Sequence, residues 1–224
     1  LGRDTKVDEL SRERIEEIIA AFGAAARVCR EAGFDGAEPH GAHSYLFNDF
    51  FKPDQNHRTD DFGGSLENRC RMGVQLVEAM RCGGGEGFLV GYRHTPTGAE
   101  YGIEESLVFA GRLVDAGLDF LDVSPACDEE PADLAAPFAA QLDVPVVAVG
   151  GMEDAGAAES ALRDGRCGLV ALGRQMIADA RWPDKVRQGR FDEILSCTKC
   201  NACHEKLSEG KRVDCTLWTA DEVA

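Results

Sequence analysis

The sequence has no apolar run of about 18 residues or more and no recognisable signal peptide, so it predicts no membrane span. It also carries little positive charge: 24 Lys and Arg residues stand against 40 Asp and Glu, and the formal net charge is −16. This excess of negative charge disfavours nucleic acid and anionic membranes as partners. The 224 residues, 44% of them hydrophobic, suffice for one sizeable core. The first residue is Leu1 rather than Met, and we expect a processed or partial chain.

Two common architectures lack their sequence signatures. No G-x-G-x-x-G motif follows a predicted strand, which removes the main support for a Rossmann fold. The nine cysteines do not indicate a secreted disulfide framework, because the chain is too long for a stapled mini-domain and four thiols cluster at metal-ligand spacing. We therefore expect a protein of the reducing cytoplasm.

Alternating apolar strands and amphipathic helices make up most of the chain. Ser11 can cap a first helix that ends near Gly33, and its apolar residues recur every 3.6 positions. A polar loop is expected after the first strand, up to about Gly64, and Ser65 can cap the next helix. The expected strands are residues 34–40, 88–93, 120–124, 144–149 and 169–172. The expected later helices are residues 104–116, 132–142, 155–164 and 175–185.

This alternation predicts a parallel sheet, and the α/β fold that it favours is the (β/α)8 TIM barrel. A complete barrel needs eight strand–helix units, whereas five can be identified. We expect residues 1–190 to form the C-terminal five units of a barrel, followed by a cysteine segment at residues 191–224; an open sheet is the alternative. Pro39 removes one ladder hydrogen bond from the first strand, and the apolar run at 144–149 predicts a strand buried on both faces.

The loops after the last two expected strands hold Gly150-Gly151 and Gly173-Arg174. Barrels often bind phosphate with the loops after strands seven and eight. Glycines let backbone N–H groups approach a phosphate, and Arg174 can add a charged fork. The pattern indicates a phosphate site, with ordinary turn glycines as the structural alternative.

Polar side chains follow the ends of the first two expected strands, where barrels carry their catalytic groups. His40 and His43 can donate hydrogen bonds to a carbonyl or bind an anion, and Tyr45 can supply a proton to a carbanion. Arg93 can stabilise negative charge on a reduced ring cofactor. Each residue alone also has a structural explanation, but together they predict a catalytic site.

Four cysteines near the end of the chain follow the pattern C-T-K-C-N-A-C-(x11)-C. They are Cys197, Cys200, Cys203 and Cys215. Four thiolates at this spacing suit a tetrahedral or cuboidal metal centre. In an enzyme-like chain they indicate an iron–sulfur cluster, with structural zinc as the alternative. His204 lies among them, and we expect it to be a neighbour of the metal centre rather than a ligand.

Several motifs resemble those of the old yellow enzyme class of FMN-dependent oxidoreductases. They are F-D-G-A-E-P-H-G-A-H-S-Y-L (34–46), N-H-R-T-D-D-F-G-G-S-L-E-N-R (56–69), V-G-Y-R (90–93), V-G-G (149–151) and L-G-R-Q-M-I-A-D (172–179). The cysteine pattern is similar to the branch with a 4Fe–4S centre, which comprises 2,4-dienoyl-CoA reductases, enoate reductases and trimethylamine-type dehydrogenases.

The resemblance implies an FMN-binding barrel with a defined set of site residues. His40 and His43 would face the substrate, Tyr45 would donate a proton, and Arg93 would contact the flavin ring. The FMN phosphate would be held by Gly150, Gly151, Gly173 and Arg174. The 4Fe–4S cluster would be held by Cys197, Cys200, Cys203 and Cys215. NAD(P)H is the implied electron donor, and the branch carries nucleotide-binding domains, one of which can hold FAD.

Three functions follow as expectations. The first is reduction of an activated C=C bond of a small molecule, in which His40 and His43 polarise a carbonyl and Tyr45 protonates the α-carbon. The second is oxidation of a small amine, which the x2, x2 cysteine spacing favours, although His40 stands where the trimethylamine enzyme has tyrosine. The third is a non-catalytic fragment that binds zinc. The first three barrel strands and the later domains are missing, so a further segment or partner chain is expected, and a homo-oligomer is an option.

Overall fold

The computed structural model describes residues 8–126 and 131–218. Within these ranges one parallel sheet runs in the order β1-β3-β4-β5-β6, and β2 also pairs with β3. The strands are β1 (Gly36–Ala37), β2 (His40–Gly41), β3 (Leu89–His94), β4 (Phe120–Val123), β5 (Val146–Val149) and β6 (Leu169–Ala171). The helices are α1 (Arg12–Glu31), α2 (Leu46–Phe51), α3 (Leu66–Gly84), α4 (Ile103–Asp115), α5 (Pro131–Gln141), α6 (Ala155–Arg163), α7 (Arg174–Ala178), α8 (Trp182–Arg187), the 3-10 helix η1 (Phe191–Glu193) and α9 (Ala202–Ser208).

β1 and β2 are the two halves of the first expected strand. Gly36 lies opposite Leu89 and His40 lies opposite Arg93, so both halves follow β3 in the same register. Pro39 stands between them and has no N–H to donate, but its carbonyl accepts a hydrogen bond from the Arg93 N at 3.2 Å. The predicted interruption is therefore confirmed, and the register places His40 beside Arg93.

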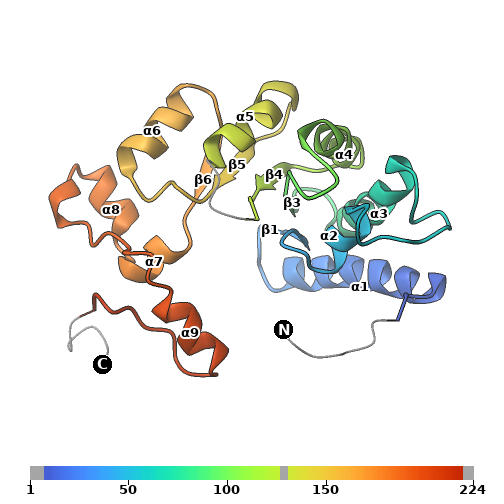
Figure 1. The fold of residues 1–224 in the computed structure, drawn as a ribbon, viewed down its shortest axis with the longest axis horizontal. Coiled ribbons are helices and arrows are strands. Elements are labelled where there is room, and N and C mark those ends of the chain that lie inside the picture. Colours follow the sequence, from blue (N-terminus) through green and yellow to red (C-terminus); the bar gives the residue numbers. More distant parts are fainter. Residues whose placement is uncertain (1–7, 127–130, 219–224) are drawn as a thin grey trace.

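The elements follow an open arc from α1 to α9, with α4, α5 and α6 along the outer side of the strands (Figure 1). Strand residues that face these helices, such as Val90 and Leu121, are fully buried. On the concave face, Leu89 and Leu169 are 47% and 49% exposed. The expected five units are thus present as part of a (β/α)8 barrel, and the arc does not close over its inner face among the described residues.

β5 corrects the prediction of a strand buried on both faces. Val146 and Ala148 are buried under the helices, whereas Val147 and Val149 are only half-buried. These two valines face the concave side of the sheet, where the described chain supplies no opposing layer. Burial on both faces requires the filled interior of a closed barrel.

Both predicted serine caps are confirmed. The Ser11 Oγ accepts a hydrogen bond from the Arg14 N at 3.2 Å, and the Ser65 Oγ accepts one from the Asn68 N at 3.3 Å. The helices that they begin, α1 and α3, are 20 and 19 residues long. Among the described residues, no helix combines the length and the apolar character needed to cross a membrane.

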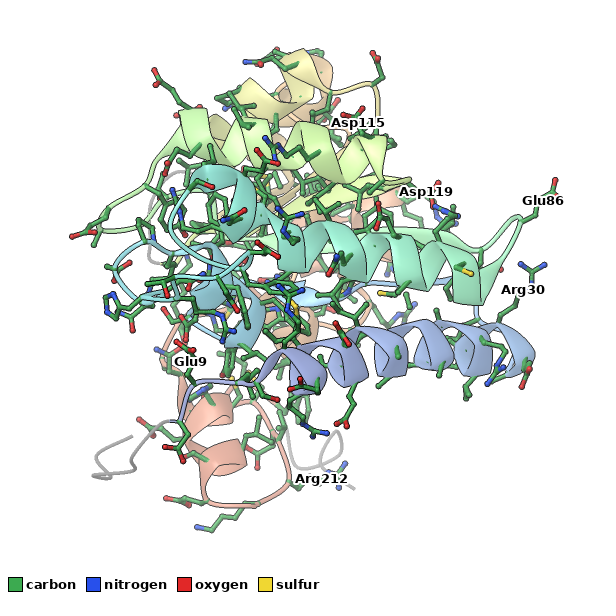
Figure 2. The ribbon with its side chains drawn as sticks, turned by 90° about the vertical axis from the view of Figure 1, so that its right-hand side faces the viewer. Glu9, Arg30, Glu86, Asp115, Asp119 and Arg212 are labelled. Atoms are coloured by element: carbon green, nitrogen blue, oxygen red, sulfur yellow. The ribbon has the colours of Figure 1, made fainter. Side chains whose placement is uncertain are left out.

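α1 and α3 lie side by side (Figure 2). They approach so closely that a Cβ added at Gly83 would stand 1.9 Å from the Gly23 carbonyl oxygen. At one end of the pair the Arg30 guanidinium donates to the Gly84 carbonyl at 2.5 Å and also to the Glu86 carbonyl. Figure 2 shows Arg30 and Glu86 at this shared end.

Two segments differ from expectation. The loop expected up to Gly64 contains α2, because Phe47, Phe50 and Phe51 are buried at helical spacing. The single final helix expected at 175–185 is divided into α7 and α8. Asp179 leaves the helical conformation, with φ −143°, and its carboxylate accepts a hydrogen bond from the Arg181 N at 3.0 Å.

Candidate functional site

The turn after β2 holds His43 in an uncommon backbone conformation. His43 and Ser44 have φ values of 58° and 57°, in the left-handed region that residues with a Cβ rarely adopt. Two buried side chains fix the turn: the Thr95 Oγ1 accepts from the His43 N at 3.0 Å, and the Asn48 Oδ1 accepts from the Ser44 N at 2.9 Å. Backbone held in this way by its surroundings is a feature of functional sites.

His43 and Arg93 meet on the hydroxyl group of Ser124. The His43 Nε2 lies 2.9 Å from the Ser124 Oγ, and the Arg93 guanidinium donates to the same oxygen at 2.9 Å. Burial lowers the pKa of His43, the charge of Arg93 lowers it further, and a hydrogen bond to the Pro125 backbone opposes them. The imidazole is therefore neutral at pH 7. The ends of β2, β3 and β4 thus supply one connected polar group.

Two carboxyl groups lie near Arg93 on the concave face. The Arg93 Nε is 3.7 Å from the Asp122 Oδ1, and neither atom has a hydrogen-bond partner within the described parts of the chain. Burial raises the pKa of Asp122 to about 6, with Arg93 opposing the shift. The Glu38 side chain is exposed on the concave face, but the protein atoms around its carboxyl group partly desolvate it. This desolvation, followed by the charge of Asp122, raises the pKa of Glu38 to about 7. Both carboxyl groups therefore titrate close to neutrality.

His40 and Tyr45 extend the cluster that starts at His43. The ring of His40 lies 5.2 Å from that of His43 and 5.3 Å from that of Tyr45, measured between centroids. Burial lowers the pKa of His40, and Arg93 adds to the effect. Tyr45 immediately precedes α2 and is 62% exposed. The structure thus brings the three predicted catalytic side chains together, with Tyr45 at the solvent side.

A cavity of about 940 Å³ lies along the strand ends. The predicted site residues on its wall are His43, Arg93, Gly150, Gly151, Gly173, Arg174, Cys197 and Cys203. Gly150 and Gly151 have φ values of 86° and 66°, and a Cβ added at Gly173 would meet no atom within 4 Å. Backbone of this kind can face a ligand directly. The volume falls in the range of about 300–1,000 Å³ typical of small-molecule and cofactor sites, so the cavity and its donors fit FMN.

The cysteine segment reaches the wall of the same cavity. All four predicted ligand cysteines are free thiols. The Lys199 N donates to the Cys197 Sγ at 3.4 Å, and the backbone N–H of Ala202 lowers the pKa of Cys200. Lys199 and Asn201 have φ values of 56° and 61°, which turns the chain tightly between the cysteines. These donors fit thiolate ligation, although no three Cys, His, Asp or Glu side chains of the described residues are arranged to share a metal ion.

Four residues that shape the site were not predicted from the sequence. Ser124 directly follows a strand, the same signal that identified Arg93, and could have been found in this way. Asp122 is a lone carboxylate inside the apolar strand F-L-D-V, which is also a visible signal. Thr95 and Gln175 act through tertiary hydrogen bonds. No sequence pattern marks either of them.

The structure is thus a partial (β/α)8 barrel with glycine loops and a cationic side chain around one cavity at the strand ends, where barrels of this kind carry their ligand sites. The chain belongs to the NADH:flavin oxidoreductase / NADH oxidase family, whose profile matches residues 3–124 and 131–193. It is 34% identical over 232 residues to an NADH oxidase of Thermoanaerobacter brockii, covering 95% of the chain and 36% of that protein. It is 31% identical over 242 residues to a cinnamate reductase of Clostridium sporogenes, covering 93% of the chain and 36% of that protein.

Solved structures show the same relationship. A 2-naphthoyl-CoA reductase in complex with 2-naphthoyl-CoA matches with a TM-score of 0.88 and 29% identity, over 94% of the chain and 35% of that protein. A histamine dehydrogenase from Rhizobium sp. 4-9 matches with a TM-score of 0.84 and 27% identity, over 96% of the chain and 34% of that protein. The chain thus spans about a third of the length of these similar proteins.

Proposed function

We propose that the whole protein is an FMN- and 4Fe–4S-dependent oxidoreductase that reduces a C=C bond conjugated to a carbonyl group, with electrons from NAD(P)H. One observation carries the proposal. Neutral His43 and cationic Arg93 meet on Ser124 at the wall of a cavity that also holds the glycine loops and Cys197. Two similar proteins are named for cinnamate and 2-naphthoyl-CoA, which both carry C=C bonds conjugated to a carboxyl or thioester carbonyl.

Each site residue has a role in this reaction. FMN, when bound, supplies hydride and single-electron transfer. Arg93 offers a fixed positive charge to its ring, and the glycine loops with Arg174 offer N–H groups and a guanidinium to its phosphate. His40 is neutral and can donate a hydrogen bond to a substrate carbonyl, and neutral His43 can do the same once its N–H leaves its present partner, Ser124 or the Pro125 backbone. Such bonds stabilise the negative charge that develops on the carbonyl oxygen. Tyr45 is exposed, so it can protonate the α-carbon and recover its proton from solvent.

The proposed cluster is held by Cys197, Cys200, Cys203 and Cys215. Part of the support for this cluster is the share of the chain that aligns with the naphthoyl-CoA reductase structure. The match to the naphthoyl-CoA reductase leaves out only 6% of the chain, about 13 residues, which is fewer than the 34 residues of positions 191–224. That match therefore continues beyond the family profile, which ends at residue 193, and into the cysteine segment. The cavity wall contains Cys197 and Cys203, and this supports a cluster that would lie next to the proposed flavin site.

A second candidate function is the oxidation of a small amine. The match to histamine dehydrogenase favours it, because that protein is nearly as similar in structure as the naphthoyl-CoA reductase. The same residues would then hold the same cofactors, and electrons would leave through the cluster.

Turnover assays with the whole protein distinguish the two functions. NADPH or NADH with an enone should be consumed, whereas an amine with a dye acceptor should not; turnover of the amine alone would show that the first function is wrong. Tyr45→Phe should slow enone reduction by about 10²- to 10⁴-fold while flavin reduction by NAD(P)H keeps its rate. Metal analysis of an anaerobic preparation should find iron and acid-labile sulfide. If the analysis finds zinc and no iron, the four cysteines form a structural zinc site and the proposed cluster is wrong.

A further inference from the structure

Helix α7 directly follows the proposed phosphate loop, and its side chains contact the cysteine segment. It begins at Arg174, directly after Gly173, and Gln175 follows at only 3% exposure. A glutamine is seldom this deeply buried unless its amide is fully hydrogen-bonded. The partners of this amide therefore show what the residue does.

Both ends of the Gln175 amide bind the backbone of the cysteine segment. The Gln175 Nε2 donates to the Leu195 carbonyl at 2.9 Å, and the Gln175 Oε1 accepts from the Cys197 N at 2.9 Å. One side chain thus pairs with a carbonyl and an N–H on either side of residue 196, as a neighbouring strand would. Glutamine is suited to this because its amide is both a donor and an acceptor.

We call the two hydrogen bonds from Gln175 to Leu195 and Cys197 the side-chain clamp. Two further side chains of this region, Asp179 and Arg174, add hydrogen bonds to the same segment. The Asp179 carboxylate, 6% exposed, accepts from the Leu195 N at 3.0 Å and from the Lys185 Nζ at 2.7 Å. The Arg174 guanidinium donates to the Asn201 Oδ1 at 2.7 Å, and Asn201 lies between two of the predicted ligand cysteines. The chain from 195 to 201 is therefore attached to α7 and its C-terminal cap at several points.

We propose that Gln175 is a positioning residue that fixes the backbone of Cys197 for cluster assembly. The proposal rests on the assignment of Cys197 as a cluster ligand. Hydrogen bonds that orient metal ligands from outside the coordination shell typically change metal affinity by about 10- to 100-fold. Gln175 also follows Arg174 on α7, so the same helix fixes the edge of the proposed flavin site and the first cysteine of the proposed cluster.

The test compares three variants of the whole protein prepared without oxygen. Gln175→Met keeps the length of the side chain and removes both hydrogen bonds. Gln175→Glu keeps the acceptor for the Cys197 N and loses the donor to the Leu195 carbonyl. Gln188→Met makes the same chemical change at an exposed glutamine after α8 and serves as the control. The measurements are iron and acid-labile sulfide per chain, the rate of iron loss to a chelator, and hydrogen exchange of the amides from 195 to 203.

We expect Gln175→Met to lose iron at least about ten-fold faster than the wild type, with the Gln188 control unchanged. Gln175→Glu should also lose iron faster than the wild type, because its buried carboxylate would face the Leu195 carbonyl oxygen. Amide exchange at Cys197 should rise in Gln175→Met while exchange in β3 stays the same, which separates local release from unfolding. The proposal would be overturned if both Gln175 variants retained iron as well as the wild type and if the Cys197 amide exchanged at the wild-type rate. If the wild type binds no iron, the proposed cluster fails, and exchange at Cys197 alone then decides whether Gln175 positions the segment.

Discussion

Replacing Asp122 by asparagine should remove a pH-dependent loss of stability. Burial raises the pKa of this carboxyl group from 3.8 to about 6, and the charge of Arg93 opposes the shift. The folded state therefore holds the proton more tightly than the unfolded state does, and the wild type loses stability as the pH rises from about 4 to about 6. A shift of about two pKa units corresponds to roughly 3 kcal/mol. Asparagine does not titrate, so the variant escapes this loss.

The quantity to measure is the free energy of unfolding of the variant minus that of the wild type. Urea unfolding at fixed ionic strength, between pH 4 and pH 7, should show this difference rising by roughly 2–3 kcal/mol in favour of Asp122→Asn. The attraction between ionised Asp122 and Arg93 also changes with pH, but it is already included in the pKa of about 6 and does not add to this difference. A difference that stays flat across the range would refute the reasoning, because it would mean that Asp122 ionises as easily in the folded state as in the unfolded one.

Three further predictions can be checked by urea unfolding, the first two near neutral pH and the third as a function of pH. Gly73→Ala should lower the free energy of unfolding by about 1–3 kcal/mol, because its Cβ would stand 2.5 Å from the Phe109 ring. Gly111→Ala, whose Cβ would meet no atom within 4 Å, should raise it by up to about 1 kcal/mol. Equal changes in the free energy of unfolding for the two variants would contradict the packing described. Ser106→Ala should cost about 1–3 kcal/mol, because the buried Ser106 hydroxyl bonds to both the His94 Nε2 and the Pro96 carbonyl, and an unchanged midpoint would argue against that network. Glu38→Gln should show a rise with pH of the same sign as Asp122→Asn but smaller, since Glu38 remains exposed on the concave face, and a fall with pH would contradict the raised pKa of Glu38.

Local patterns predicted the strands well and the polar connections less well. Each expected strand is present because runs such as 144–149 combine apolar residues with flanking turn residues, and that information is contained within a few positions. α2 was missed because its three phenylalanines stand in a polar loop and become helical only when they pack against neighbouring elements. The break between α7 and α8 depends on how the Asp179 side chain bonds to the backbone, which a helical period does not reveal.

In the candidate site, too, some residues could be predicted from local sequence and others could not. His43 and Arg93 could be named from their positions at strand ends, because parallel strands bring those ends to one edge. Ser124, which joins them, and Asp122, which faces Arg93, each left a local signal in the sequence. Their roles, however, depend on distances between strands rather than along the chain. Gln175 shows this most clearly, since both of its partners are 20 or more residues away in the sequence.

The two sides of the cavity are held by different kinds of hydrogen bond: backbone pairing between strands on one side, and side-chain bonds to the backbone on the other. His40, Arg93 and Asp122 are in register across β2, β3 and β4, so their relative positions follow from the sheet itself. Cys197 has no strand partner in the described chain, and side-chain hydrogen bonds from Gln175 and its neighbours take the place of a ladder. A sheet ladder opens only with the core that covers it, whereas a side-chain clamp can open alone. Amides of β3 should therefore exchange with a free energy close to that of global unfolding, and the Cys197 amide with a smaller one; equal protection of both would show that the cysteine segment and the sheet open as one unit.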